Sequence, residues 1–304
     1  MKSTPEFLHQ PIKIIGEKYR RIENEEHRRL VKSFDPTAVS SYSLRDGLAS
    51  KDKNRYSDVI PYDFNRVKLD KGDQYINASY IQLGIGKDTG IANYIATQGP
   101  IFETASDFWR MCDQVCKKRI VIVMVTPLFE KNREKCYKYW NDTDFDVFDE
   151  EGDKLIQLKL IEKRYSDRGH FRVTRWETDR GKEVVHFYYD EWEDFSRPSS
   201  HEHILELIKE VNEARENEEG REEDPLIVHC SAGVGRTGTF ITIDYFLSHC
   251  MEHREKWNEE GTDPVEDIVR NLRKQRMMMV QRPQQLQFVY DTIREYWEEP
   301  SKLR

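Results

Sequence analysis

The sequence predicts a single α/β domain, and three observations carry this prediction. Short apolar runs typical of buried strands, such as residues 120–125 and 226–229, alternate with amphipathic segments typical of helices. Aromatic residues make up 12% of the 304 residues, which is too many for a disordered chain. No internal repeat, low-complexity tract or linker-like stretch divides the chain. We therefore expect one domain with a large core rather than two domains.

The expected elements follow from local patterns. Phe108, Met111, Cys112 and Val115 recur at i, i+3, i+4 and i+7, which predicts an amphipathic helix within residues 103–118. By similar reasoning we expect further helices at residues 17–32, 201–219, 237–250, 264–276 and 284–298. We expect strands at residues 74–81, 91–98, 120–125, 154–161, 184–190 and 226–229. Residues 35–54 are rich in Ser, Asp, Lys and Gly and are expected to form a loop.

Composition and charge exclude several classes of function. The formal net charge is −8, with 56 acidic residues against 48 Lys and Arg, which argues against nucleic-acid binding and against attraction to anionic lipid. The longest apolar run, residues 120–125, is too short to cross a bilayer. The N-terminus MKSTPEFLHQ lacks the apolar core of a signal peptide. We expect a cytoplasmic, monomeric protein without membrane insertion.

Five cysteines show no CxxC spacing, so the sequence predicts neither a disulfide framework nor a zinc site. One of them, Cys230, begins the most informative segment. Residues 226–238 read LIVHCSAGVGRTG, an apolar strand followed by a glycine-rich loop and an apolar helix. Glycines allow the backbone to approach a ligand closely, and amides at a helix N-terminus bind anions.

Cys230 and Arg236 give this loop its predicted chemistry. Arg236 presents a planar fork that matches two phosphate oxygens. The amides and the helix dipole favour the thiolate of Cys230, which would attack phosphorus and form a phosphocysteine intermediate. The backbone of Ser231, Ala232, Gly233, Val234 and Gly235 would bind the phosphate oxygens. A Walker A loop is excluded because it requires GK[ST], whereas this loop reads GRT.

The segment HCSAGVGRTG resembles the signature loop of the cysteine-dependent protein tyrosine phosphatases. Other segments resemble motifs of the phosphotyrosine-specific, non-receptor branch in the same order: residues 54–61 (NRYSDVIP), 73–80 (DQYINASY), 96–100 (ATQGP), 130–136 (EKNREKC) and 281–285. The resemblance covers roughly residues 50–298. It implies one catalytic domain there, with a highly twisted mixed β-sheet flanked by helices, and an N-terminal extension, residues 1–49, packed on it. It also implies an enzyme that needs no metal or cofactor and acts on tyrosine-phosphorylated proteins.

The resemblance also assigns the substrate-recognition loop and a general acid. Tyr56 would stack on the substrate ring in a deep pocket, and Asp58 would accept hydrogen bonds from the substrate backbone. The family carries its acid in a mobile loop that reads WPD. Here residues 192–194 read WED. The resemblance implies Asp194 as the acid and Trp192 as its support, while Glu193 stays open as an alternative acid.

Glu193 stands where the family's WPD loop has proline, so a backbone N–H is present there and φ is not fixed by a ring. We therefore expect this loop to sample its open and closed states differently from a WPD loop. Some yeast cytosolic members resemble this chain in lacking the proline, which suggests a fungal source. The other implied roles are water positioning by Gln281 with help from Gln285, leaving-group stabilisation by Thr237, and support from His229, Glu130 and Lys135. Arg273, in a basic cluster, is expected near the cleft rim.

Two other classes remain open. A phosphotyrosine-binding pseudo-enzyme would use the same pocket without turnover, and Glu193 at the proline position of the loop is compatible with this alternative. A dual-specificity phosphatase would have a shallow pocket and would lack a loop such as NRYSDV.

Overall fold

The computed structural model describes residues 4–34, 41–71, 75–85, 90–193, 198, 200–217, 220–221, 224–258 and 261–299. Within them the strands are β1 (Arg66–Lys68), β2 (Tyr75–Leu83), β3 (Ala92–Thr97), β4 (Arg119–Met124), β5 (Phe129–Glu130), β6 (Arg133–Glu134), β7 (Phe145–Phe148), β8 (Lys154–Ser166), β9 (Phe171–Thr178), β10 (Glu183–Tyr188), β11 (Glu216–Asn217), β12 (Gly220–Arg221) and β13 (Leu226–His229).

The α-helices are α1 (Ile12–Phe34), α2 (Arg45–Ala49), α3 (Ala105–Val115), α4 (His201–Arg215), α5 (Gly235–Tyr245), α6 (Pro264–Gln275) and α7 (Pro283–Glu298). The short helices are η1 (Glu6–His9), η2 (Lys51–Lys53), η3 (Phe102–Thr104), η4 (Phe246–Cys250) and η5 (Met251–Asn258). None of the helices among the described residues is long and apolar enough to cross a membrane.

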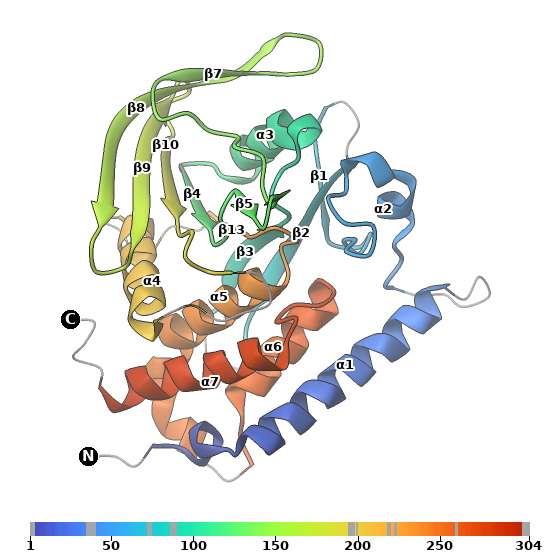
Figure 1. Cartoon of the computed structure of the whole chain (residues 1–304), viewed down its shortest axis with the longest axis vertical. Coiled ribbons are helices and arrows are strands. Elements are labelled where there is room, and N and C mark those ends of the chain that lie inside the picture. The colour runs from blue at the N-terminus through green and yellow to red at the C-terminus, as the bar shows by residue number, and fades with distance from the viewer. Residues whose placement is uncertain are drawn as a thin grey trace.

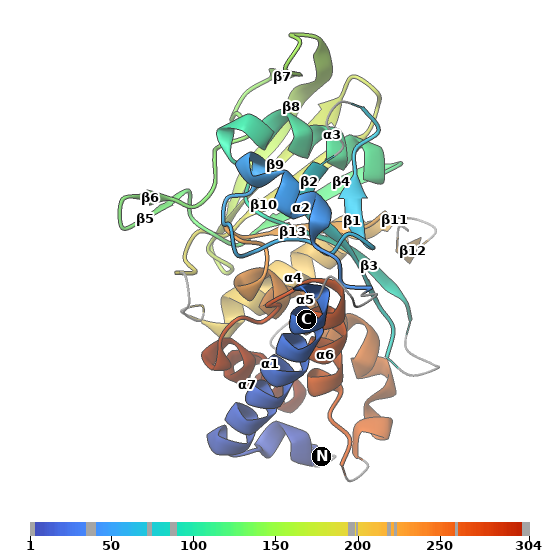
Figure 2. The ribbon, with the colours of Figure 1, turned by 90° about the vertical axis from the view of Figure 1, so that its right-hand side faces the viewer.

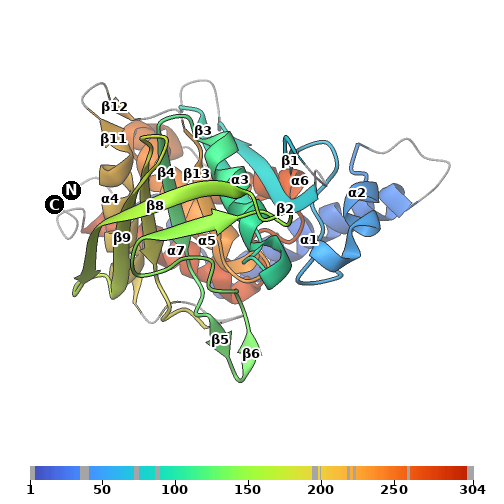
Figure 3. The same ribbon diagram turned by 90° about the horizontal axis from the view of Figure 1, so that it is seen from above.

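A nine-stranded mixed sheet runs through the described part of the chain, in the order β1-β2-β3-β13-β4-β10-β9-β8-β7. The central strand β13 pairs in parallel with both β3 and β4, and β4 pairs in parallel with β10. The other pairings in this sheet are antiparallel. The sheet twists strongly from β1 to β8 (Figure 3). The predicted mixed sheet with flanking helices is confirmed.

Side chains along the central strands point alternately to the two faces of the sheet, which gives one hydrophobic core on each face. In β4, Ile120, Ile122 and Met124 face one core, while Val121 and Val123 face the other, as the two-residue period of a strand requires. The first core lies under α3, and the second is covered by α4, α5, α6 and α7, which lie on the opposite face of the sheet (Figures 1 and 2). Helix α1 packs against α6 and α7 at the outer side of that second layer.

Several predicted elements differ from the structure. Residues 35–54 were expected to form a loop, but α2 and η2 lie in the described part of that range. Strand β8 extends five residues beyond the predicted end at 161, and β9 was not predicted, because its alternation is interrupted by polar residues on both faces. The helix predicted at 201–219 ends at Arg215, and β11 begins directly after it at Glu216.

Candidate active site

The signature loop lies at the carboxyl end of the central strand. Strand β13 ends at His229, Cys230 follows directly, and α5 begins at Gly235. Cys230 is only 3% exposed, and the Gly233 backbone N–H donates a hydrogen bond of 3.2 Å to its Sγ. The local sequence therefore places the sulfur at the N-terminus of a buried helix, where amides and the helix dipole stabilise negative charge.

Close packing against backbone leaves no room for a Cβ at Gly233 and Gly238, and a Cβ at Gly235 would meet a side chain. Gly233 has a φ of +71°, and a Cβ there would lie 2.2 Å from the Thr97 carbonyl oxygen. A Cβ at Gly235 would lie 3.0 Å from the Gln285 amide atoms, and one at Gly238 would lie 2.5 Å from the Val280 nitrogen. The loop is thus held between β3 and the segment that precedes α7.

Gly233→Ala is expected to destabilise the fold by about 3 kcal/mol, because left-handed strain and overpacking against backbone add together. Gly181→Ala is the matched control, since Gly181 has a φ of +75° but open space around its Cβ position. That control should cost only about 1 kcal/mol. Urea denaturation of both variants measures the difference. Equal losses would contradict the packing shown for Gly233.

The Arg236 side chain is held in place by two acceptors. It is 1% exposed, and its NH1 donates to Glu130 Oε1 and to the Trp192 carbonyl, each at 2.7 Å. Lys135 Nζ lies 3.5 Å from Glu130 Oε2. Glu130 and Lys135 come from the β5–β6 hairpin, so this hairpin orients the guanidinium. Asp194 and the residues up to 197 lie outside the described residues, and the structure therefore does not place the predicted acid.

The recognition segment contacts the signature loop directly. The Tyr56 hydroxyl is 2.8 Å from Ser231 Oγ, and Ser231 Oγ donates to the Lys135 carbonyl at 2.8 Å. Asp58 is exposed to solvent, where a substrate backbone could reach it. The structure thus brings Tyr56, Ser231 and Lys135 together, although the sequence separates them widely.

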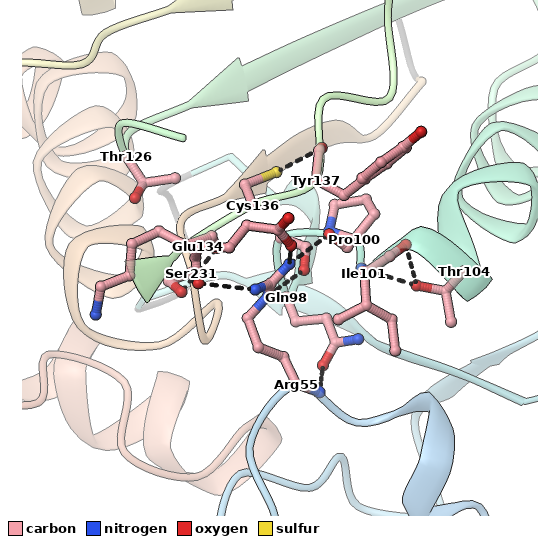
Figure 4. A network of polar contacts seen from close by, with 12 residues as sticks. Arg55, Gln98, Pro100, Ile101, Thr104, Thr126, Glu134, Cys136, Tyr137 and Ser231 are labelled. Carbon is pink, nitrogen blue, oxygen red and sulfur yellow. Dashed lines mark hydrogen bonds and ion pairs between the residues drawn. The ribbon is translucent and has the colours of Figure 1, made fainter. Parts of the chain in front are cut away.

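Arg55 and Gln98 fix this recognition segment, and sequence reasoning missed both. Arg55 donates to the carbonyls of Gly99, Pro100 and Glu134, and Gln98 bridges the backbone of Arg55 and Lys53 (Figure 4). Both residues lie within segments that resemble family motifs, NRYSDVIP and ATQGP, and this was the sequence signal that could have identified them.

Arg276 stabilises the signature loop by binding its carbonyl groups, and it was not predicted as a site residue. Fully buried, it donates to the carbonyls of Ala232 and Gly233 and to the side chains of Asn77 and Ser79. Burial lowers the pKa of Arg276 to about 10, so the group remains cationic at neutral pH. By binding loop carbonyls on one side, it helps to orient the loop amides toward the other.

The expectation for Arg273 is wrong. Its side chain is buried rather than at the cleft rim, and its NH1 pairs with Glu26 Oε2 at 2.6 Å. It also donates to the carbonyls of Met279 and Val280. The reason is α1, whose docking against α6 covers this position with an acid that the local sequence around Arg273 does not reveal.

Four predicted residues lie around the starts of α5 and α7. Gln285 Oε1 accepts from the backbone N–H groups of Gln281 and Arg282, which fixes the turn that carries Gln281. Thr237 follows Arg236 in the first turn of α5, and its Oγ1 is buried with no hydrogen-bond partner among the described residues. Val234 is fully buried at the N-cap of α5.

His229, which precedes Cys230, belongs to a buried group of polar side chains with Tyr139 and His186. Its Nε2 is 2.7 Å from the Tyr139 hydroxyl, and its Nδ1 is 3.0 Å from the Cys230 carbonyl oxygen. The same Tyr139 hydroxyl is 2.9 Å from Nε2 of His186. Burial lowers the pKa of His229 to about 4 and that of His186 well below its ordinary value.

These histidines predict a pH dependence of stability. In the unfolded chain a histidine has a pKa of about 6.5, so below that pH the unfolded state binds protons that the native state does not. The free energy of unfolding should therefore fall as the pH decreases from about 6.5 to about 4, with a contribution from His229 of about 3 kcal/mol. Urea titrations across this range should give a shallower fall for His229→Gln. The exposed His9→Gln should keep the wild-type slope, and an unchanged slope in His229→Gln would contradict the prediction.

The site joins a buried cysteine, a buried guanidinium and a loop of backbone amides at a helix N-terminus, an arrangement that can hold a phosphate group. A sequence model described as protein-tyrosine phosphatase matches residues 50–295, and the chain belongs to that family. The chain is 37% identical to Tyrosine-protein phosphatase 1 of Saccharomyces cerevisiae, over 95% of this chain and 96% of that protein. It is 36% identical to Tyrosine-protein phosphatase 1 of Schizosaccharomyces pombe, of which it spans about half the length (53%).

Solved structures agree with this assignment. The catalytic domain of human protein tyrosine phosphatase non-receptor type 18 matches with a TM-score of 0.77 and 28% identity, over 94% of this chain and 96% of that one. The predicted fold, family and enzyme class are therefore confirmed: the chain is a protein tyrosine phosphatase of the non-receptor type.

Proposed function

We propose that this phosphatase hydrolyses phosphotyrosine through a phosphocysteine intermediate on Cys230. The observation that carries the proposal is the convergence of Cys230, the Arg236 guanidinium and an amide-lined loop at one strand–helix junction. In the first step the thiolate forms an S–P bond as the P–O bond to the tyrosyl oxygen breaks. Asp194 donates the proton that the leaving oxygen requires.

The second step returns the enzyme to its starting state. A water molecule held by Gln281 attacks phosphorus, Asp194 takes its proton, and the S–P bond breaks to release phosphate and the thiolate. The Thr237 hydroxyl, which is buried in the first turn of α5, would stabilise the departing sulfur. Through both steps Arg236 and the backbone amides from Ser231 to Gly235 carry the charge of the phosphoryl oxygens.

Tyr56 is the basis of the proposed selectivity for phosphotyrosine. Its hydroxyl is held by Ser231, so the ring stands beside the loop that contains the buried Cys230. A phosphotyrosine side chain can reach a sulfur at this depth, whereas phosphoserine is too short. Asp58 would accept hydrogen bonds from the substrate backbone.

Tyr56→Ala is expected to lower kcat/KM for a phosphotyrosine peptide about tenfold, because the ring contact with the substrate is lost. Tyr56→Phe retains the ring and should lose much less. Hydrolysis of matched phosphotyrosine, phosphoserine and phosphothreonine peptides, in EDTA, measures both the selectivity and the independence from metal.

The same assay separates the proposal from its alternatives. Comparable turnover of phosphothreonine would indicate a dual-specificity enzyme. Tight peptide binding without turnover would indicate a binding protein. Strong, EDTA-resistant hydrolysis of phosphotyrosine alone supports the proposal.

We also propose the bounds of the catalytic domain, the class of partner and the absence of a cofactor requirement. Residues 50–298 would form the catalytic domain, and residues 1–49 an extension of which α1 packs on α6 and α7. The partners would be tyrosine-phosphorylated proteins of the cytoplasm, and the enzyme would act as a monomer without nucleic acid. Catalysis itself would require no cofactor.

A further inference from the structure

Three side chains from separate elements converge outside the phosphate-binding loop. His170 ends the turn between β8 and β9, Glu191 follows β10, and His203 lies in the first turn of α4. Each offers one donor atom, and these atoms all lie within 4.8 Å of one another. Nδ1 of His170 is 3.1 Å from Glu191 Oε1, and Nδ1 of His203 is 3.7 Å from Glu191 Oε2.

The donor types and distances fit a transition-metal ion. Two imidazoles and one carboxylate are a known ligand set for Zn²⁺ with an open fourth position. Tetrahedral Zn²⁺, with ligands at about 2.0–2.2 Å, separates neighbouring donors by about 3.3 Å, close to the observed spacing. The two imidazole rings are stacked, with centroids 4.1 Å apart, and a rotation of the rings about their side-chain bonds would direct both nitrogens to one ion.

Solvent access also favours metal binding. The side chains of His170 and Glu191 are 43% and 41% exposed, which leaves a path from solvent and room for a water ligand, whereas His203 is 13% exposed.

We propose that His170, Glu191 and His203 form a binding site for a divalent transition-metal ion such as Zn²⁺. The ion would join the β8–β9 turn, the segment after β10 and α4. One of its ligands, Glu191, immediately precedes Trp192 in the sequence, and the Trp192 carbonyl accepts a hydrogen bond from Arg236. Cysteine spacing predicted no zinc site. It could not predict this one, because the ligands come from three elements and no spacing motif connects them.

Isothermal titration of Zn²⁺ into the Cys230→Ser protein tests the proposal, since this background removes a thiolate that would compete for the metal. We expect one Zn²⁺ per chain. Both His170→Gln and His203→Gln in the same background should weaken binding at least about tenfold. His27→Gln, which changes an exposed histidine on α1, is the matched control and should bind as the parent does.

Thermal unfolding gives a second readout that does not depend on catalysis. Zn²⁺ at about 100 times the parent's Kd should raise the Tm of the parent by roughly 5 °C and that of His203→Gln by at most about half as much. The absence of a Zn²⁺ site, or a site that survives both His170→Gln and His203→Gln, would overturn the proposal.

Discussion

Cys230→Ser is expected to lower kcat for a phosphotyrosine peptide by about 10⁵-fold, the scale of losing a nucleophile. A serine hydroxyl at this position is not ionised at neutral pH, so no nucleophile remains to form the bond to phosphorus. The rest of the site should survive, because Cys230 contributes only its sulfur to the loop contacts and serine has nearly the same shape. Steady-state assays with phosphopeptide measure the loss.

Binding provides the control for this variant. Cys230→Ser should still bind the phosphotyrosine peptide, since Arg236 and the loop amides are unchanged. A matched change at another buried cysteine, Cys250→Ser, should leave kcat within a few-fold of the wild type. Retention of more than a few per cent of activity in Cys230→Ser would contradict the nucleophile assignment.

Arg236→Lys is expected to lower kcat by about 10³-fold, although the positive charge is kept. An ammonium group cannot reproduce the planar fork that meets two phosphoryl oxygens. It also cannot keep the geometry of the contacts to Glu130 and the Trp192 carbonyl, which fix the guanidinium plane. Because these contacts are buried, the variant should lose stability as well as activity.

Arg133→Lys is the matched control for Arg236→Lys. Arg133 is exposed on the same hairpin that carries Glu130, so its replacement should change neither kcat nor the free energy of unfolding measurably. A decrease of less than tenfold in Arg236→Lys would show that phosphate recognition depends on charge alone, which contradicts the role given to the guanidinium fork.

The part of the site that the sequence predicts is the part encoded locally. Residues 226–238 contain the strand, the loop, the glycines and the start of α5 in one segment, so the position of Cys230 at a helix N-terminus follows from neighbouring residues. The contact between Gly233 and Thr97, in contrast, depends on the pairing of β13 with β3, which no local pattern specifies.

The residues that were missed act over long sequence distances. Arg276 reaches the carbonyls of Ala232 and Gly233, and Tyr139 reaches His229, only after the sheet and helices have packed. Arg273 shows the opposite error, because its basic neighbourhood suggested a position near the cleft rim. Glu26 of α1 buries and pairs it in the folded chain. Charge patterns in a sequence thus predict chemistry, but not which charges are neutralised by distant elements.

The central claim is the phosphocysteine on Cys230, and trapping that intermediate tests it most directly. The Gln281→Ala enzyme, in which hydrolysis of the intermediate should be slowed, is mixed with a phosphotyrosine peptide, denatured rapidly and analysed by peptide mass spectrometry. We predict one phosphoryl group on the peptide that contains Cys230, and none in the Cys230→Ser protein. Continued turnover with no phosphoryl group on Cys230, or with the group on another residue, would contradict the account.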